Sequence, residues 1–234
     1  MLISVIIIFL SLIQIIIRTT HKRNTIAIEP YIRQLKNTQG KEKEDVILKI
    51  GLAGNKQAIP ILEGILKDDP NLDIKKKTAF SLGRLDREKL LNNLSSESED
   101  VKAAVVDGLI TLWLLSKNEG LHSATIEGSR DNPNKGNIDI ITDKFSTFND
   151  STKLKILTYM RNQKFEDKVI MIAENTSESF EVRKKSLNIL QTIGTEKVID
   201  NLSTLIQNDL NEEIRDAARK THEIIEKKFK EVYF

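Results

Sequence analysis

The stretch DDPNLDIKKKTAFSLGRL, residues 68–85, decides the fold of this chain. It opens on Asp68-Asp69-Pro70, which ends the preceding helix, because the residue before a proline avoids the helical region of backbone space. Thr78 and Leu82 then stand four and eight residues past Ile74. Spacings of four and eight place side chains on one face of a helix. The stretch therefore predicts a turn followed by a helix with one buried side.

The same pattern recurs along the chain. Its anchor is a β-branched residue followed by Lys or Arg, usually with an acid just before it. The strong copies are Asp73-Ile74-Lys75, Asp100-Val101-Lys102, Glu181-Val182-Arg183 and Glu213-Ile214-Arg215, and the weaker ones are Asp45-Val46 and Thr152-Lys153. Eight residues past four of these anchors stand Leu82, Leu109, Met160 and Leu190, which we expect to be buried. A second apolar-periodic helix follows most copies, so the unit is a helix pair that cannot bury its apolar face without neighbours.

Turn signals separate these predicted helices. Residues 54–75 align without a gap over residues 194–215, and each stretch opens on a glycine. We expect both glycines, Gly54 and Gly194, to end a helix in the left-handed conformation, and the residues after them to cap the next helix. Further along, Ser96 and Glu99 form a capping-box pattern ahead of Val101.

Residues 68–85 resemble the short HEAT repeat of bacterial proteins related to phycobilisome lyases. That repeat has an acid-rich turn, then Val-Arg, a small pair and Leu-Gly, and these positions are matched by Ile74-Lys75, Thr78-Ala79 and Leu82-Gly83. The resemblance extends over about residues 44–225. It implies an all-α fold, a right-handed α-α superhelix (a HEAT-like α-solenoid), which we expect to hold about five to six helix pairs.

A hydrophobic segment precedes the repeats. Residues 2–17 read LISVIIIFLSLIQIII, in which thirteen of sixteen residues are Leu, Ile, Val or Phe. Such a run favours bilayer insertion by several kcal/mol, and at about 1.5 Å per residue it nearly spans the hydrocarbon core. A cleaved signal peptide would need a basic start and a small-residue cleavage site, and this segment has neither. A buried core helix would show a polar stripe, whereas this segment is apolar all round. We therefore expect one transmembrane helix over residues 1–18.

The charges behind this segment predict its orientation. Arg18, Lys22 and Arg23 follow the apolar run, so the positive-inside rule predicts a single-pass protein of the cytoplasmic membrane with its body in the cytoplasm. These three are among the chain's 36 basic residues, which leaves 33 against 34 acidic residues in the body. A near-neutral body is a poor platform for nucleic acid, which favours a clustered basic face.

The sequence predicts three parts. They are a transmembrane anchor at residues 1–18, a juxtamembrane linker with a docking helix at 19–41, and a HEAT-repeat α-solenoid at 42–234. A loop insertion at about 116–137 carries several Gly residues and Asn-Pro. Long loops in compact arrays are either functional or disordered, and the sequence favours neither. It also leaves open whether residues 102–151 hold one helix pair or two.

One position of the repeat carries a cation in five copies. Stacking of the units should align these side chains in a ladder: Lys75, Lys102, Lys153, Arg183 and Arg215. They could form a stripe that binds phosphate or an acidic partner. Alternatively, each could pair with an acid of its own or a neighbouring unit, such as Asp73, Asp100, Glu181 and Glu213. We favour the ion pairs, because the acids repeat together with the cations.

The chain offers few groups for catalysis or metal binding. It has no Cys, and its three histidines, His21, His122 and His222, stand apart from one another. We single out no catalytic, cofactor-binding or metal-binding residue. We therefore expect a membrane-anchored scaffold or adaptor, not an enzyme, that binds protein partners through its solenoid surface, without cofactor, nucleic acid or small-molecule substrate. The alternatives are a nucleic-acid-binding HEAT-like protein or, on the resemblance alone, a bilin-lyase-like enzyme.

Overall fold

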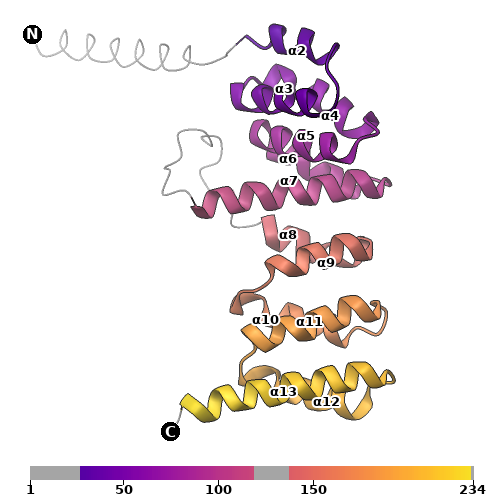
Figure 1. Ribbon diagram of the computed structural model, residues 1–234, viewed down its shortest axis with the longest axis vertical. Coiled ribbons are helices and arrows are strands. Elements are labelled where there is room, and N and C mark those ends of the chain that lie inside the picture. The colour runs from indigo at the N-terminus through magenta and orange to yellow at the C-terminus, as the bar shows by residue number, and fades with distance from the viewer. Residues whose placement is uncertain (1–26, 119–136, 233–234) are drawn as a thin grey trace, which may run out of the picture. The chain divides into compact units, whose positions relative to one another are not determined.

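The computed structural model describes residues 27–118 and 137–232 of the chain (Figure 1). Within those residues the regular structure consists of the α-helices α2 to α13 and short 3₁₀ turns. The all-α prediction is therefore confirmed for the part of the chain that the structure describes. The chain divides into two compact units, Met1–Ile138 and Asp139–Phe234, and we describe each unit by itself.

The first unit is built on three neighbouring helices that lie in one layer. Its helices are α2 (Glu29–Leu35), α3 (Gly40–Ala53), α4 (Ile59–Asp68), α5 (Leu72–Leu85), α6 (Arg87–Asn92) and α7 (Glu99–Asn118). Helices α3, α5 and α7 lie side by side in chain order, and α4 and α6 both pack against α5 (Figure 1). We call α3, α5 and α7 the first helices of their pairs.

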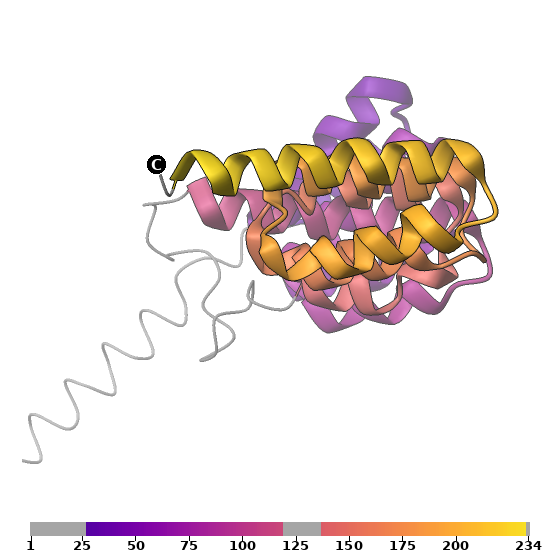
Figure 2. The ribbon, with the colours of Figure 1, turned by 90° about the horizontal axis from the view of Figure 1, so that it is seen from below.

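The second unit repeats this plan. After α8 (Asn137–Asp143), which spans the boundary, its helices are α9 (Asp150–Tyr159), α10 (Glu166–Glu174), α11 (Phe180–Ile193), α12 (Ile199–Asn208) and α13 (Glu212–Val232). The first helices α9, α11 and α13 pack in succession, while α10 packs on α11 and α12 on α13. Figure 2 shows yellow α13 and amber α12 in two separate layers.

The predicted core position is confirmed. Leu82, Leu109, Met160 and Leu190 are each 0% exposed. In α5, α7 and α11 this position is the eleventh residue and in α9 it is the cap that follows, each time one turn beyond another buried residue. The spacing of four and eight found in the sequence is therefore the buried face of the first helices.

Side chains in the turns cap the helices. Asn55 and Thr195 accept hydrogen bonds from backbone N–H groups two residues ahead, and these two predicted caps are confirmed. The capping box predicted at Ser96 is wrong by two residues. The hydroxyl of Ser98 accepts the bond from the N–H of Val101 at 3.4 Å, while Ser96 accepts from the N–H of Ser98. Ser98 directly precedes the first residue of α7, so it occupies the capping position.

The two predicted helix-ending glycines differ. Gly54 has φ 71°, so the left-handed conformation predicted for it is confirmed. Gly194 has φ −63° and ψ 140°, which any residue can adopt, so the same prediction is wrong there. A Cβ atom on Gly194 would lie 2.4 Å from Cδ1 of Ile225 and 2.5 Å from the carbonyl oxygen of Leu190. Gly194 therefore provides space for α13 rather than an unusual backbone angle.

Glycines also bring the first helices of the first unit into close contact. A Cβ atom on Gly51 of α3 would lie 2.7 Å from the side chain of Ser81 on α5. A Cβ on Gly108 of α7 would lie 2.9 Å from the backbone of Ala79 on α5. The hydroxyl of Ser81 donates a hydrogen bond of 3.0 Å to the carbonyl oxygen of Ile47 on α3. Helix α5 is thus held closely by a neighbour on each side.

The structure corrects the predicted localisation. In residues 27–118 and 137–232, no helix is both long enough and apolar enough to cross a membrane. The two longest, α7 and α13, carry charged residues on their outer faces. The prediction of a single-pass membrane protein is therefore wrong for this part of the chain. The predicted anchor at residues 1–18 and the cations Arg18, Lys22 and Arg23 lie outside the described residues.

The predicted linker and loop are covered in part. Helix α2 lies in the predicted docking segment at residues 19–41. Helix α7 runs into the start of the predicted loop at about 116–137 and ends at Asn118, and residues 119–136 lie outside the described residues. In the interval predicted to hold one or two helix pairs, the described residues form α7, α8 and the beginning of α9.

Candidate functional site

The cationic ladder is one structural position. Each member is the fourth residue of a first helix: Lys75 of α5, Lys102 of α7, Lys153 of α9, Arg183 of α11 and Arg215 of α13. The structure adds a sixth member, because α3 begins at Gly40 and its fourth residue is Lys43. The sequence pattern missed Lys43.

The sequence pattern missed Lys43 for a physical reason. The sequence pattern placed the first anchor at Val46, whereas the structure places it at Glu42, one helical turn earlier. A shift of four residues keeps the same face buried, so the apolar spacing cannot distinguish the two registers. Glu42 also replaces the β-branched residue of the other copies. In addition, Gln39, at the start of α3, makes no side-chain cap that would mark where the helix begins.

Two ladder lysines form ion pairs with acids in the turn before the next first helix. Lys43 Nζ lies 2.5 Å from Oδ2 of Asp69, which precedes α5. Lys153 Nζ lies 2.6 Å from Oε2 of Glu178, which precedes α11. Since each pair joins one helix pair to the next, we call these contacts, together with the Arg183–Asp209 pair, the inter-repeat ion pairs.

The Arg183–Asp209 pair is the most extensive of the three. Nη2 of Arg183 bonds Oδ2 of Asp209, and Nη1 lies 3.4 Å from Oδ1. The Nε–H group of Arg183 donates to the carbonyl oxygen of Ala173 at 2.8 Å, near the C-terminus of α10. A cation at a helix C-terminus opposes the partial negative charge there. Arg183 therefore ties the end of α10 to the turn that precedes α13.

Asp209 is held in its ionised form. Burial raises the pKa of Asp209, but the hydrogen bonds from the Arg183 side chain and the Asn211 backbone lower it, as do the charges of Arg183 and Arg215. The lowering effects outweigh burial, so the pKa lies below the ordinary value for an aspartate. The carboxylate is therefore charged at neutral pH and attracts cations from two consecutive first helices.

The other ladder cations also make contacts within the chain. Lys75 Nζ donates to the carbonyl oxygen of Lys67 at the end of α4, at 2.8 Å. Arg215 Nη1 donates to the carbonyl oxygen of Asp209 at 2.7 Å. Lys102 Nζ lies 2.5 Å from Oε1 of Glu99 in its own helix.

Two of the acids suggested by the sequence pair elsewhere. Asp73 pairs with Lys76 at 2.8 Å, and Glu213 lies 3.7 Å from Lys184. The ladder side chains therefore bond helix ends and turn acids of the chain itself. Because Lys75, Lys153 and Arg183 are buried, a partner in solution has little access to them.

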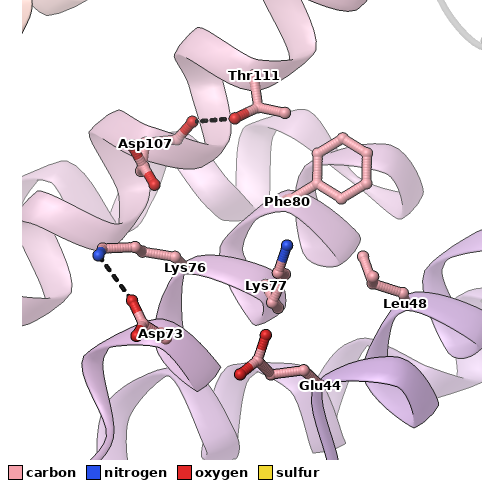
Figure 3. Close-up of a pocket in the computed structure, with 8 residues that line it drawn as sticks. All are labelled: Glu44, Leu48, Asp73, Lys76, Lys77, Phe80, Asp107 and Thr111. Carbon is pink, nitrogen blue, oxygen red and sulfur yellow. Dashed lines mark hydrogen bonds and ion pairs between the residues drawn. The ribbon is translucent and has the colours of Figure 1, made fainter. Parts of the chain in front are cut away.

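A surface that a partner could reach lies elsewhere, on the outer side of the first unit. A groove of about 630 Å³ crosses α3, α5 and α7 (Figure 3). It is lined by Glu44 and Leu48 from α3, Asp73, Lys76, Lys77 and Phe80 from α5, and Asp107 and Thr111 from α7. The groove therefore belongs to the layer of first helices, on the face turned away from the core.

The groove has an apolar centre. Leu48 and Phe80 are each the ninth residue of their helix, are half-buried, and face one another across the space between α3 and α5 (Figure 3). The guanidinium of Arg84 lies 5.9 Å from the centroid of the Phe80 ring, within the range of a cation–π contact. Leu52, one turn past Leu48, is 60% exposed. An apolar surface thus continues from the groove along α3.

Charged groups surround this centre. The ammonium of Lys76 donates to Asp73 at 2.8 Å. The hydrogen bond and charge of Lys76, with the charge of Lys77, hold the pKa of Asp73 below its ordinary value. Glu44 from α3 and Lys77 from α5 project toward the same space (Figure 3). Neither Glu44 nor Lys77 forms an ion pair with another residue that the structure describes.

The sequence contained a signal for this groove that the repeat pattern did not use. Phe80 stands two residues before the buried Leu82, and Leu48 two before the buried Ile50. On a helix, residues two apart lie on different faces, so both residues had to lie off the buried face. Apolar residues on the side expected to be solvated indicate a contact surface.

Comparisons with known proteins add little. No protein-family model matches the sequence, and no curated protein matches it. One solved structure with some similarity is the crystal structure of an engineered protein from the Northeast Structural Genomics Consortium. It is 13% identical in sequence, the match covers 86% of this chain and 96% of that chain, and the TM-score is 0.42. We base neither fold nor function on so distant a likeness.

Proposed function

We propose that this chain is a protein-binding adaptor that holds a segment of a partner protein and performs no catalysis. Its proposed fold is a HEAT-like α-solenoid, a right-handed α-α superhelix built of helix pairs. The groove across α3, α5 and α7 is its binding site. The observation that carries the proposal is the apolar centre of that groove, Leu48 and Phe80, within a charged surround. Protein interfaces have this composition, with an apolar core, aromatic anchors and a polar rim.

The repeat architecture supports the family part of the proposal. Six first helices carry a cation at their fourth residue, from Lys43 to Arg215. Three of these cations bond an acid in the turn ahead of the next first helix. Arrays in which each repeat contacts its neighbours create extended surfaces suited to partner proteins.

The electrostatics of the groove favour protein over nucleic acid. Its lining holds three acids, Glu44, Asp73 and Asp107, against two lysines, and these acids would repel phosphate. The lowered pKa of Asp73 keeps that carboxylate ionised, whereas a general base works best with a pKa near the operating pH. Both features support binding rather than phosphate recognition or proton transfer.

Photocrosslinking tests the proposal. A photoreactive amino acid replaces Leu52, which is exposed beside the groove, and the protein is irradiated in extracts of its source cells. We expect covalent adducts with a small set of proteins. Phe80→Asp should abolish these adducts, because a charge then occupies the apolar centre.

The matched control is Asn188→Asp. Asn188 is the ninth residue of α11, as Phe80 is of α5, and it is exposed in the second unit. This variant adds the same charge away from the groove and should leave the adducts unchanged. Equal adducts from the Phe80→Asp protein and the parent protein would show that the groove is not the binding site.

A further inference from the structure

We infer that the occupant of the groove is an extended peptide segment that carries an apolar side chain flanked by one cation and one carboxylate. The inference rests on the proposed function and names the class of ligand that the groove selects. Three features carry it: the span of the groove, its apolar centre, and the two opposite charges that project into it.

The span of the groove fits a short extended segment. The groove crosses three neighbouring first helices, whose axes are spaced about 8–10 Å apart when helices pack. It therefore runs for about 16–20 Å, which an extended chain covers with about five to six residues at 3.3–3.6 Å each. Its volume of about 630 Å³ lies in the range of sites that enclose a ligand.

The apolar centre accepts one side chain. Leu48 and Phe80 come from adjacent helices and face one another (Figure 3). An aliphatic or aromatic side chain placed between them covers apolar surface on both helices. The Arg84 guanidinium lies 5.9 Å from the centroid of the Phe80 ring, and this cation–π contact favours the observed position of the ring.

The charges of Glu44 and Lys77 determine which ligand groups fit beside the apolar side chain of the ligand. Glu44 lies one turn before Leu48 on α3, and Lys77 lies nearly one turn before Phe80 on α5. Among the described residues Glu44 and Lys77 have no ion-pair partner, in contrast to Asp73 and Lys76. A ligand cation over α3 and a ligand carboxylate over α5 would complement both.

Segments of a single charge fit poorly. An acidic segment meets Glu44, Asp73 and Asp107, and a basic segment meets Lys76 and Lys77. Like charges placed opposite one another across an interface oppose binding of the wrong partner. The groove therefore selects a segment with one charge of each sign in a fixed order along its length.

Selection from a random peptide library displayed on phage tests the inference. The full chain, a charge-exchange variant Glu44→Lys/Lys77→Glu, and Phe80→Asp are immobilised in parallel. The parent protein should enrich peptides with an apolar residue between a cation and an acid. The exchange variant, which keeps the net charge, should enrich peptides with the two charges in reverse order. Phe80→Asp should enrich neither.

Synthetic peptides then give the size of the effect. A peptide selected by the parent protein should bind the exchange variant at least about tenfold more weakly, and its charge-reversed version should show the opposite preference. Leu48→Asn serves as a second, milder apolar-centre variant, with circular dichroism to confirm that each protein folds.

Two results would overturn the inference. The first is the same charge order from the parent protein and the exchange variant. The second is no peptide enrichment while the photoreactive residue at Leu52 still captures proteins that Phe80→Asp loses. In the second case the groove binds protein surfaces that are not linear segments, and the proposed function stands. Equal crosslinks from the Phe80→Asp protein and the parent protein would instead overturn the proposed function.

Discussion

The two units differ most at the ninth residue of their first helices. In the first unit this position holds Leu48, Phe80 and Asp107, and in the second it holds Thr158, Asn188 and Lys220. The position faces away from the core in both units. Two of the three positions are therefore apolar in the first unit and none is apolar in the second, although both units bury the same helical face.

The inter-repeat ion pairs also differ between the units, because the Arg183–Asp209 pair of the second unit is more deeply buried than the Lys43–Asp69 pair of the first. In the first unit the side chains of Lys43 and Asp69 are 23% and 6% exposed. In the second unit those of Arg183 and Asp209 are 7% and 3% exposed. The first unit thus has the groove and the more exposed pair, and the second has the buried, bidentate pair. The same repeat plan thus carries the groove in one unit and the most deeply buried ion pair in the other.

The largest expected effect tests whether the two units are equivalent in their cores. Leu190→Ala in α11 and Leu82→Ala in α5 each remove a fully buried side chain at the same helix position. Each should cost about 2–5 kcal/mol of unfolding free energy. Hydrogen exchange should show faster amides mainly in the unit that carries the change, because repeats contact mainly their neighbours. Unaltered urea unfolding of Leu190→Ala would refute the alignment of the helices.

The second prediction compares the Arg183–Asp209 and Lys43–Asp69 ion pairs, for which we expect smaller losses of unfolding free energy. Asp209→Asn leaves Arg183 buried beside a neutral group, and we expect it to cost about 1.5–3 kcal/mol, the range for hydrogen bonds to charged groups. Asp69→Asn should cost about 1 kcal/mol or less, because Lys43 can reach water. Both asparagines keep an oxygen for the backbone N–H two residues ahead. Equal losses of unfolding free energy, measured by urea unfolding, would contradict the prediction that the more buried pair contributes more.

The Asp209 pair should also depend on pH. The pKa of Asp209 is lowered in the folded protein, so its stabilising contribution is fully present above the ordinary carboxyl pKa of about 3.9. The contribution is lost as the pH falls through the lower, folded value. The difference in unfolding free energy between the parent protein and Asp209→Asn should therefore be constant from about pH 7 to 5 and shrink below about pH 4. A difference that grows on acidification would show that the pair does not stabilise the fold.

The last comparison sets Gly64, where we expect a small effect, against Gly194. Gly64 lies inside α4 of the first unit, with open space where a Cβ would stand. Gly64→Ala should therefore stabilise by about 0.5–1 kcal/mol, since alanine restricts the unfolded chain and suits a helix. Gly194→Ala in the second unit should destabilise by about 1–3 kcal/mol, because its Cβ would overlap Ile225. Thermal melts of both variants should shift in opposite directions.

The sequence predicted the features that depend on local spacing. Leu82 and Leu190 were recognised because apolar residues four apart share a helical face. Asn55 and Thr195 were recognised as caps because their side chains act within two residues. The all-helical class followed from the same local patterns.

The partners of the ladder could not be predicted in this way. Asp69 lies 26 residues from Lys43, and Asp209 lies 26 residues from Arg183, so these pairs depend on how consecutive helix pairs dock. The groove depends on three helices coming together, and its apolar residue Leu48 stands in the copy whose register was misplaced by one turn. Local spacing carries no information about either arrangement.

The close helix contacts in the first unit have a mechanical consequence. Gly51 against Ser81, and Gly108 against Ala79, bring the backbones of neighbouring first helices close together. Packed backbone is stiff, because interiors at close-packed density resist compression and shift only as a whole. We therefore expect the groove across α3, α5 and α7 to keep its width. Under the proposed function, an oversized ligand side chain should bind more weakly rather than push the helices apart.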